Sequence, residues 1–173
     1  MSMTQAALER RAGNRDGQVR ALREGLGELE ALSDRYFLPT VALHLAGALI
    51  ESTGSEAEID SLCALARERT LSEDLVNFVY LDGIEGLVHA RRGQCDEAAP
   101  LALRCVEAAD ATDHFDVIAF ARLCAAETLA LCGERNEAAA LAEGAVAVHE
   151  GKGDVTGAAW ARSRASEIGL AVV

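Results

Sequence analysis

The sequence predicts an all-α protein, a superhelical solenoid of about four helical hairpins closed by a C-terminal capping helix. Three observations lead to this fold class. The 173 residues contain two prolines and 4% aromatic side chains, a composition that favours helices over strands. Glycines recur about every forty positions, at Gly13, Gly54, Gly93 and Gly133. Small residues recur with the same period on both sides of these glycines, which indicates a repeated structural unit.

The small residues have fixed places in each repeat. They stand seven positions before the glycine, at Ala6, Gly47, Gly86 and Ala126, and twelve positions after it, at Gly25, Ala66, Cys105 and Ala145. Two antiparallel helices approach closely only where a side chain on each is nearly absent. We therefore expect each glycine to mark the turn of a hairpin and the small residues to lie where its helices touch.

The elements follow from this period and from local start and stop signals. Helices are expected at 3–12, 16–34, 38–53, 56–69, 73–92, 96–111, 114–132, 136–150 and 154–168. They form hairpins at 3–34, 38–69, 73–111 and 114–150, with a cap at 154–168. Pro39 suits a first helical turn, Asp96 and Asn136 are expected as N-caps, and Pro100 must lie close to a helix start. No Pro/Gly/Ser-rich linker interrupts the chain, so one domain is predicted over 1–173.

Charge and hydropathy limit the possible partners. The net charge is −12, and residues 1–35 are neutral, with six acidic and six basic side chains. The excess therefore lies on the rest of the chain, where it repels phosphate backbones and argues against nucleic-acid binding by this segment. No apolar run approaches the roughly 18 residues of a membrane span, and the N-terminus lacks the apolar core of a signal peptide. A cytoplasmic protein is expected.

The cysteines predict thiols rather than a disulfide framework. Their number is odd and no CxxC pair occurs, which favours a reducing compartment. Cys63, Cys105, Cys124 and Cys132 fall in helical apolar patterns and are expected in the core. Cys95 lies in a predicted turn and is expected as an incidental surface cysteine.

Two of the repeats match a known pattern. Gly86, Gly93, Ala98 and Cys105, and then Ala126, Gly133, Ala138 and Ala145, resemble the tetratricopeptide repeat. The period near 40 differs from the usual 34, and the large aromatics of the first helix are mostly missing. The long Ala-rich repeats and the last helix also look like the C-terminal tails of large bacterial signalling proteins and transcriptional regulators. These likenesses imply a non-catalytic protein-interaction scaffold in bacterial signalling or regulation.

The resemblance also implies a binding surface, because the first helix of each hairpin then lines a concave groove. The residues expected to contact a partner are His44, Glu51, Tyr80, Leu87, Arg91, Phe120, Leu123 and Glu127. This mainly apolar wall suits an amphipathic helix of a protein or peptide partner. The same side chains could instead form the core between helices, and the sequence leaves both possibilities open.

Two other function classes stay open at this point. The neutral N-terminal hairpin or the helix carrying Trp160 could pair between copies to form a homodimer. A helical enzyme or small-ligand binder would use His89, Asp82 and Glu85. However, His89 fits interhelical packing, and the two carboxyl groups fit a solvated acidic face. No two histidines have the i, i+4 spacing of a helical metal site, so neither catalytic residues nor a metal or cofactor are expected.

Overall fold

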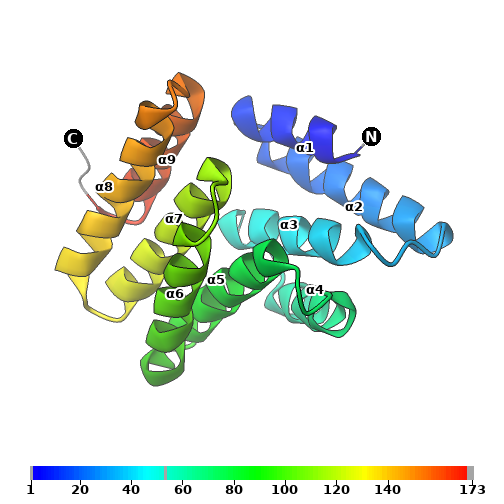
Figure 1. Cartoon of the computed structure of the whole chain (residues 1–173), viewed down its shortest axis with the longest axis horizontal. Helices are drawn as coiled ribbons and strands as arrows, with labels where there is room; N and C mark the ends of the chain where they lie inside the picture. Colours follow the sequence, from blue (N-terminus) through cyan, green and yellow to red (C-terminus); the bar gives the residue numbers. More distant parts are fainter. Residues whose placement is uncertain (1, 53, 171–173) are drawn as a thin grey trace. The chain divides into compact units, whose positions relative to one another are not determined.

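The computed structural model describes residues 2–52 and 54–170, and over these ranges it contains nine α-helices and no strand (Figure 1). The helices are α1 (Ser2–Arg11), α2 (Arg15–Ala31), α3 (Leu38–Glu51), α4 (Glu56–Arg69), α5 (Leu75–Arg91), α6 (Cys95–Asp110), α7 (Phe115–Leu131), α8 (Arg135–Gly151) and α9 (Val155–Glu167). The all-α prediction is confirmed, and each expected helix end lies within three residues of the observed one. In the described part of the chain, every helix is too short or too polar to span a bilayer.

The chain divides within α5 into two compact units, Met1–Leu81 and Asp82–Val173. In the first unit α1 packs against α2, α2 against α3, and α3 against α4. In the second unit α7 packs against α6, α8 and α9, and α8 also packs against α9. The hairpins expected at 3–34, 38–69 and 114–150 are therefore present as packed helix pairs. A single domain over the whole chain stays a prediction.

The small residues of the repeat lie where helices touch. All eight are buried: Ala6, Gly25, Gly47, Ala66, Gly86, Cys105, Ala126 and Ala145. At Gly86 in α5, an added Cβ would lie 3.2 Å from the Cβ of Leu101 and 3.4 Å from the backbone nitrogen of Ala102 in α6. Backbone cannot move aside as a flexible side chain can, so the close contact between α5 and α6 depends on glycine here. The expected need for a small residue at a helix contact is confirmed at Gly86.

The turn glycines end their helices by taking a left-handed backbone. Gly93 and Gly133 have φ of 74° and 92°, which a residue with a Cβ adopts at a cost. The next amide then reaches back along the helix, and Gln94 N–H donates to the carbonyl of His89, as in a Schellman turn. Gly54 has another role, because its added Cβ would lie only 2.7 Å from a methyl carbon of Leu49.

The expected N-caps of the second helices are wrong by about two residues. The observed caps are Gln94 and Glu134, neither with a side-chain cap hydrogen bond, while Asp96 and Asn136 lie in the first turn. Because the left-handed glycine reverses the chain tightly, the next helix begins only two residues after Gly93 and only two after Gly133. Pro100 consequently lies inside α6, beyond its first turn.

Candidate functional site

The eight predicted partner-binding residues differ in exposure. Tyr80, Leu87, Phe120, Leu123 and Glu127 are buried, His44 and Glu51 are half-buried, and Arg91 is exposed. Leu123, for example, packs with Ala145 and Ala161 in a cluster shared by α7, α8 and α9. The buried members therefore contribute to the core, which is the alternative that the sequence left open. Partner contact by the eight residues stays a prediction.

Two of these residues form an ion pair with each other. Arg91 Nη2 donates to Glu127 Oε1 at 2.7 Å, and Arg164 of α9 donates to the other oxygen of the same carboxylate. Glu127 is 7% exposed, and a buried carboxylate is tolerated only when its charge is paired and hydrogen-bonded. The pairing gives Glu127 a structural role, because it joins α7 to α5 and α9.

His44 and Tyr80 also lie together, with ring centroids 4.7 Å apart. Burial, together with the positive charge of Arg10 acting in the same direction, lowers the pKa of His44 to about 4. The imidazole is therefore uncharged at neutral pH. A partner that contacts this pair therefore meets the uncharged imidazole of His44 beside the phenol of Tyr80.

The acidic and histidine side chains considered for catalysis have other partners. Asp82 accepts hydrogen bonds from Nε and Nη2 of Arg104, both at 2.6 Å, and it is buried. The expectation of a solvated acidic face is wrong for Asp82, because the bidentate guanidinium holds the carboxylate against α6. His89 is half-buried, and its Nδ1 lies 2.9 Å from Oε1 of Gln94 in the following turn.

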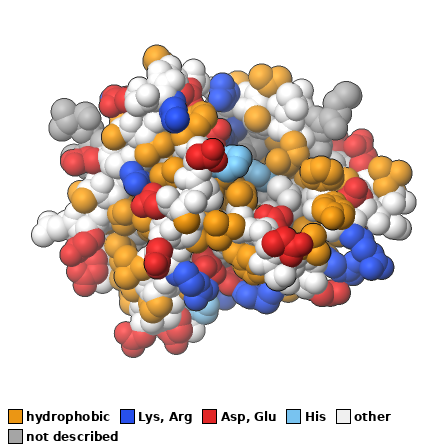
Figure 2. Space-filling view, in the orientation of Figure 1, with side chains coloured by type: hydrophobic (Ala, Val, Ile, Leu, Met, Phe, Trp, Pro, Cys, Tyr) orange, Lys and Arg blue, Asp and Glu red, His pale blue; other side chains and the backbone are white. Residues whose placement is uncertain are grey.

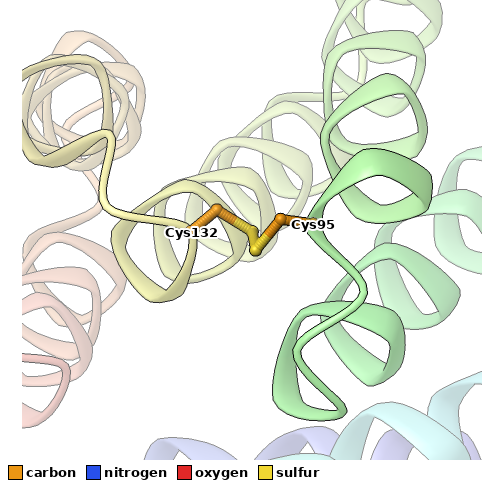
Figure 3. The surroundings of a disulfide bond; sticks show 2 residues. All are labelled: Cys95 and Cys132. Carbon is orange, nitrogen blue, oxygen red and sulfur yellow. A yellow bond between two sulfur atoms is a disulfide. The ribbon is translucent and has the colours of Figure 1, made fainter.

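A disulfide joins Cys95, the first residue of α6, to Cys132, which follows α7 (Figure 3). Their Cα atoms are 5.5 Å apart, a normal separation for a disulfide. The prediction of unpaired thiols is therefore wrong for these two residues. Each lies within two positions of a turn glycine, and this shared turn location was the signal in the sequence that could have indicated the pair.

The other cysteines are buried, as the sequence predicts: Cys63, Cys105 and Cys124. Burial raises the pKa of the Cys105 thiol to about 12, with the nearby carboxylate of Asp82 acting in the same direction. A thiol with so high a pKa is a poor nucleophile. Cys105 therefore belongs to the packing between helices rather than to a reactive site.

The turn between α2 and α3 exposes three large apolar side chains. Leu32, Tyr36 and Phe37 are 78%, 73% and 65% exposed, and hydrophobic side chains are visible at the surface along this end of α2 in Figure 2. Asp34 Oδ1 accepts hydrogen bonds from the backbone N–H groups of Tyr36 at 2.9 Å and Phe37 at 2.7 Å. The carboxylate thus fixes the turn from which both aromatic rings project.

This turn was not predicted as a candidate site from the sequence. One available signal was composition, because two of the chain's seven aromatic residues, Tyr36 and Phe37, are adjacent. The other was position. Phe37 is the N-cap of α3 and makes no side-chain cap hydrogen bond, although Ser, Asp or Asn would cap the helix better.

One group of side chains in the described residues could hold a metal ion. Asp116, His149 and Asp154 offer one ligand atom each, and these atoms lie within 4.8 Å of one another. His149 and Asp154 flank the turn between α8 and α9, and Asp116 lies in the first turn of α7. This group could not be predicted from the sequence, because its members belong to three separate helix ends.

No protein-family model, curated protein or solved structure matches the chain.

Proposed function

We propose that this chain is a non-catalytic protein-binding module of tetratricopeptide-like hairpins, and that the turn between α2 and α3 contacts its partner. The observation that carries the proposal is the exposure of Leu32, Tyr36 and Phe37 on one short turn. Aromatic side chains supply much of the binding energy at protein interfaces, since they bury a large area and lose few rotamers. While the turn is exposed to water, these three side chains do not gain the energy that burial against a partner would provide.

The rigidity of the turn supports this role. Asp34 holds the backbone amides of Tyr36 and Phe37, and Ser33 takes a left-handed φ of 54°. A non-glycine residue in this region is strained. A turn that is fixed before binding loses less conformational entropy in the complex, so more of the contact energy appears as affinity.

The chemistry of the turn favours a partner with an apolar stripe, and an amphipathic helix of another protein has one. The exposed side chains are uncharged, so shape and apolar area select the partner more than charge does. A place in bacterial signalling or regulation and a cytoplasmic location are part of this proposal. The place in signalling or regulation rests on the sequence likenesses alone. The cytoplasmic location rests on the cysteine pattern and the absence of a long apolar run in the sequence, and the disulfide between Cys95 and Cys132 argues against it, because such bonds are rare in a reducing cytosol.

Self-assembly is the second candidate, and the charge distribution favours it. Residues 1–35 are neutral, whereas the rest of the chain carries the whole net charge of −12. Two copies repel each other through their acidic parts, but the neutral hairpin and its apolar turn can meet without that cost. The same residues, Leu32, Tyr36 and Phe37, would then be covered by a second copy.

A double variant, Tyr36→Ser with Phe37→Ser, tests both candidates. The matched control is Leu103→Ser, because Leu103 is also an exposed apolar residue, 59% exposed on α6. Proteins captured from the source cell are compared by quantitative mass spectrometry, and sedimentation velocity reports self-association. We expect the double variant to lose a partner or a dimer that the wild type and the control retain, with unchanged far-UV circular dichroism. Equal capture and equal sedimentation for all three proteins would contradict the proposal.

A further inference from the structure

The turn between α8 and α9 contains a side-chain pair that recurs in this chain. His149 Nδ1 lies 3.1 Å from Oδ2 of Asp154, five residues later. The same spacing across a turn glycine joins His89 to Gln94 at 2.9 Å and Asn14 to Glu9 at 2.7 Å. Stabilising the turn is therefore enough to explain why His149 faces Asp154.

Two further features of His149 are not explained by the turn. The first is burial, because His149 is 1% exposed whereas His89 is half-buried. Phe115 and Trp160 cover the ring with edge contacts at centroid distances of 5.8 Å and 6.4 Å. The second is that Nε2 is buried and has no hydrogen-bond partner among the described residues. Leaving this atom without a partner costs free energy, but it is Nδ1, the other ring nitrogen, that lies beside Asp154.

Gly157 packs tightly against the pair, as Gly17 packs against Asn14 and Glu9 in the equivalent turn after Gly13. An added Cβ at Gly157 would lie 2.3 Å from both Nδ1 of His149 and Oδ2 of Asp154. Any other residue at position 157 would displace the imidazole or the carboxylate. Asp154 meanwhile uses its other oxygen to accept the backbone N–H of Gly157 at 3.0 Å, which fixes the carboxylate at the start of α9.

Asp116 brings a second carboxylate to this place from a different helix. With His149 and Asp154 it completes a set of one imidazole nitrogen and two carboxylate oxygens within 4.8 Å of one another. Ligand atoms about 2.0–2.2 Å from a tetrahedral ion lie roughly 3.5 Å apart, so the set must contract slightly. Asp116 is exposed, and its side chain can therefore turn inward at little cost.

We infer that Asp116, His149 and Asp154 bind a divalent transition-metal ion, of which Zn²⁺ is the best fit. A ring nitrogen suits Zn²⁺ and its first-row neighbours, whereas Mg²⁺ and Ca²⁺ prefer sites built only from oxygen. The two carboxylates balance the charge of the ion, and water completes the coordination. The bound ion ties the start of α7 to the turn between α8 and α9.

Zn²⁺ itself is the probe for the test. The full chain is treated with a chelator, kept without reductant so that Cys95 and Cys132 stay bonded, and titrated by calorimetry. We expect one equivalent to bind, with an affinity reduced at least about tenfold in Asp116→Asn and in His149→Ala. His114→Ala is the matched control, because His114 is an exposed histidine at the N-cap of the same helix, and it should bind as the wild type does.

Folding and specificity are separated by two further measurements. Asp116 is exposed, so we expect Asp116→Asn to keep the fold. Its Zn²⁺ affinity therefore tests the site even if His149→Ala unfolds. Zn²⁺ should raise the melting temperature of the wild type and of His114→Ala, but not that of Asp116→Asn. No Zn²⁺ binding by the wild type, undiminished binding by Asp116→Asn, or equally tight binding of Mg²⁺ would each overturn the inference.

Discussion

Cys95 and Cys132 are bonded through their sulfur atoms although 37 positions separate them in the sequence. One lies just after the turn that ends α5, and the other lies at the turn that ends α7 (Figure 3). A repeat of nearly constant length brings equivalent turns of successive hairpins side by side. The covalent bond therefore links two neighbouring repeats at the same end of their helices.

Removing this disulfide should lower the free energy of unfolding by about 3 to 4 kcal/mol. A crosslink that closes a loop of this length restricts the unfolded chain, and its loss restores that entropy. The double variant Cys95→Ser with Cys132→Ser is compared with the wild type by guanidinium denaturation, with and without dithiothreitol. Reductant should bring the wild type to the level of the variant and leave the variant unchanged. A fully reduced wild type of undiminished stability would refute this.

Substituting Gly86 by alanine should destabilise the protein by about 1 to 3 kcal/mol. The new Cβ would lie 3.2 Å from Leu101 Cβ and 3.4 Å from backbone of α6, so the two helices must separate. Gly27→Ala is the control, because an added Cβ there meets nothing within 4 Å. Alanine should stabilise α2 at that position by about 0.5 to 1 kcal/mol. Thermal denaturation measures both, and two variants that shift in the same direction would contradict the close contact.

The low pKa of His44 should cause the free energy of unfolding to decrease as the pH falls. Its pKa is about 4 in the folded chain, against 6.5 ordinarily, so the unfolded chain takes up the proton first. The stabilising effect is fully present above pH 6.5 and is lost as the pH falls toward 4. Because the side chain is half-buried, we expect a loss of about 1 to 2 kcal/mol between pH 7.5 and pH 5.

The control for this prediction is His44→Gln, which has no proton to take up in this range. Urea denaturation of both proteins at pH 7.5 and pH 5.0 separates the contribution of His44 from that of the carboxyl groups. The wild type should lose more stability than the variant over this interval. An identical loss in the two proteins would show that His44 is as readily protonated in the folded chain as in the unfolded one.

The helices were predictable because their signals are local. Gly93 and Gly133 indicate a left-handed backbone that few other residues adopt. Small residues such as Gly86 and Ala126 indicate a close contact between two helices, whichever helices these are. The N-caps were less predictable. Asp96 has the right chemistry for a cap, but the geometry of the glycine turn selects the residue two positions earlier.

The candidate sites were less predictable because they depend on which helix ends meet. The order of residues gives no sign that Arg164 reaches the carboxylate of Glu127, or that Asp116 approaches His149. Tyr36 and Phe37 were visible as adjacent aromatics, but their exposure depends on whether another helix covers them. Exposure is a property of the packed chain and not of the residues alone.

By itself, the sequence determined that this protein is built from helices and where nearly all of them begin and end. Helix propensity and left-handed glycines act over a few consecutive residues, so neighbouring positions in the sequence are enough to predict helices and their ends. Only the tertiary structure decided that Cys95 bonds to Cys132, that Glu127 is shared by two arginines, and that one nitrogen of His149 lacks a hydrogen-bond partner among the residues the structure describes. Those outcomes depend on distances between segments far apart in the chain, which are fixed only when the helices pack.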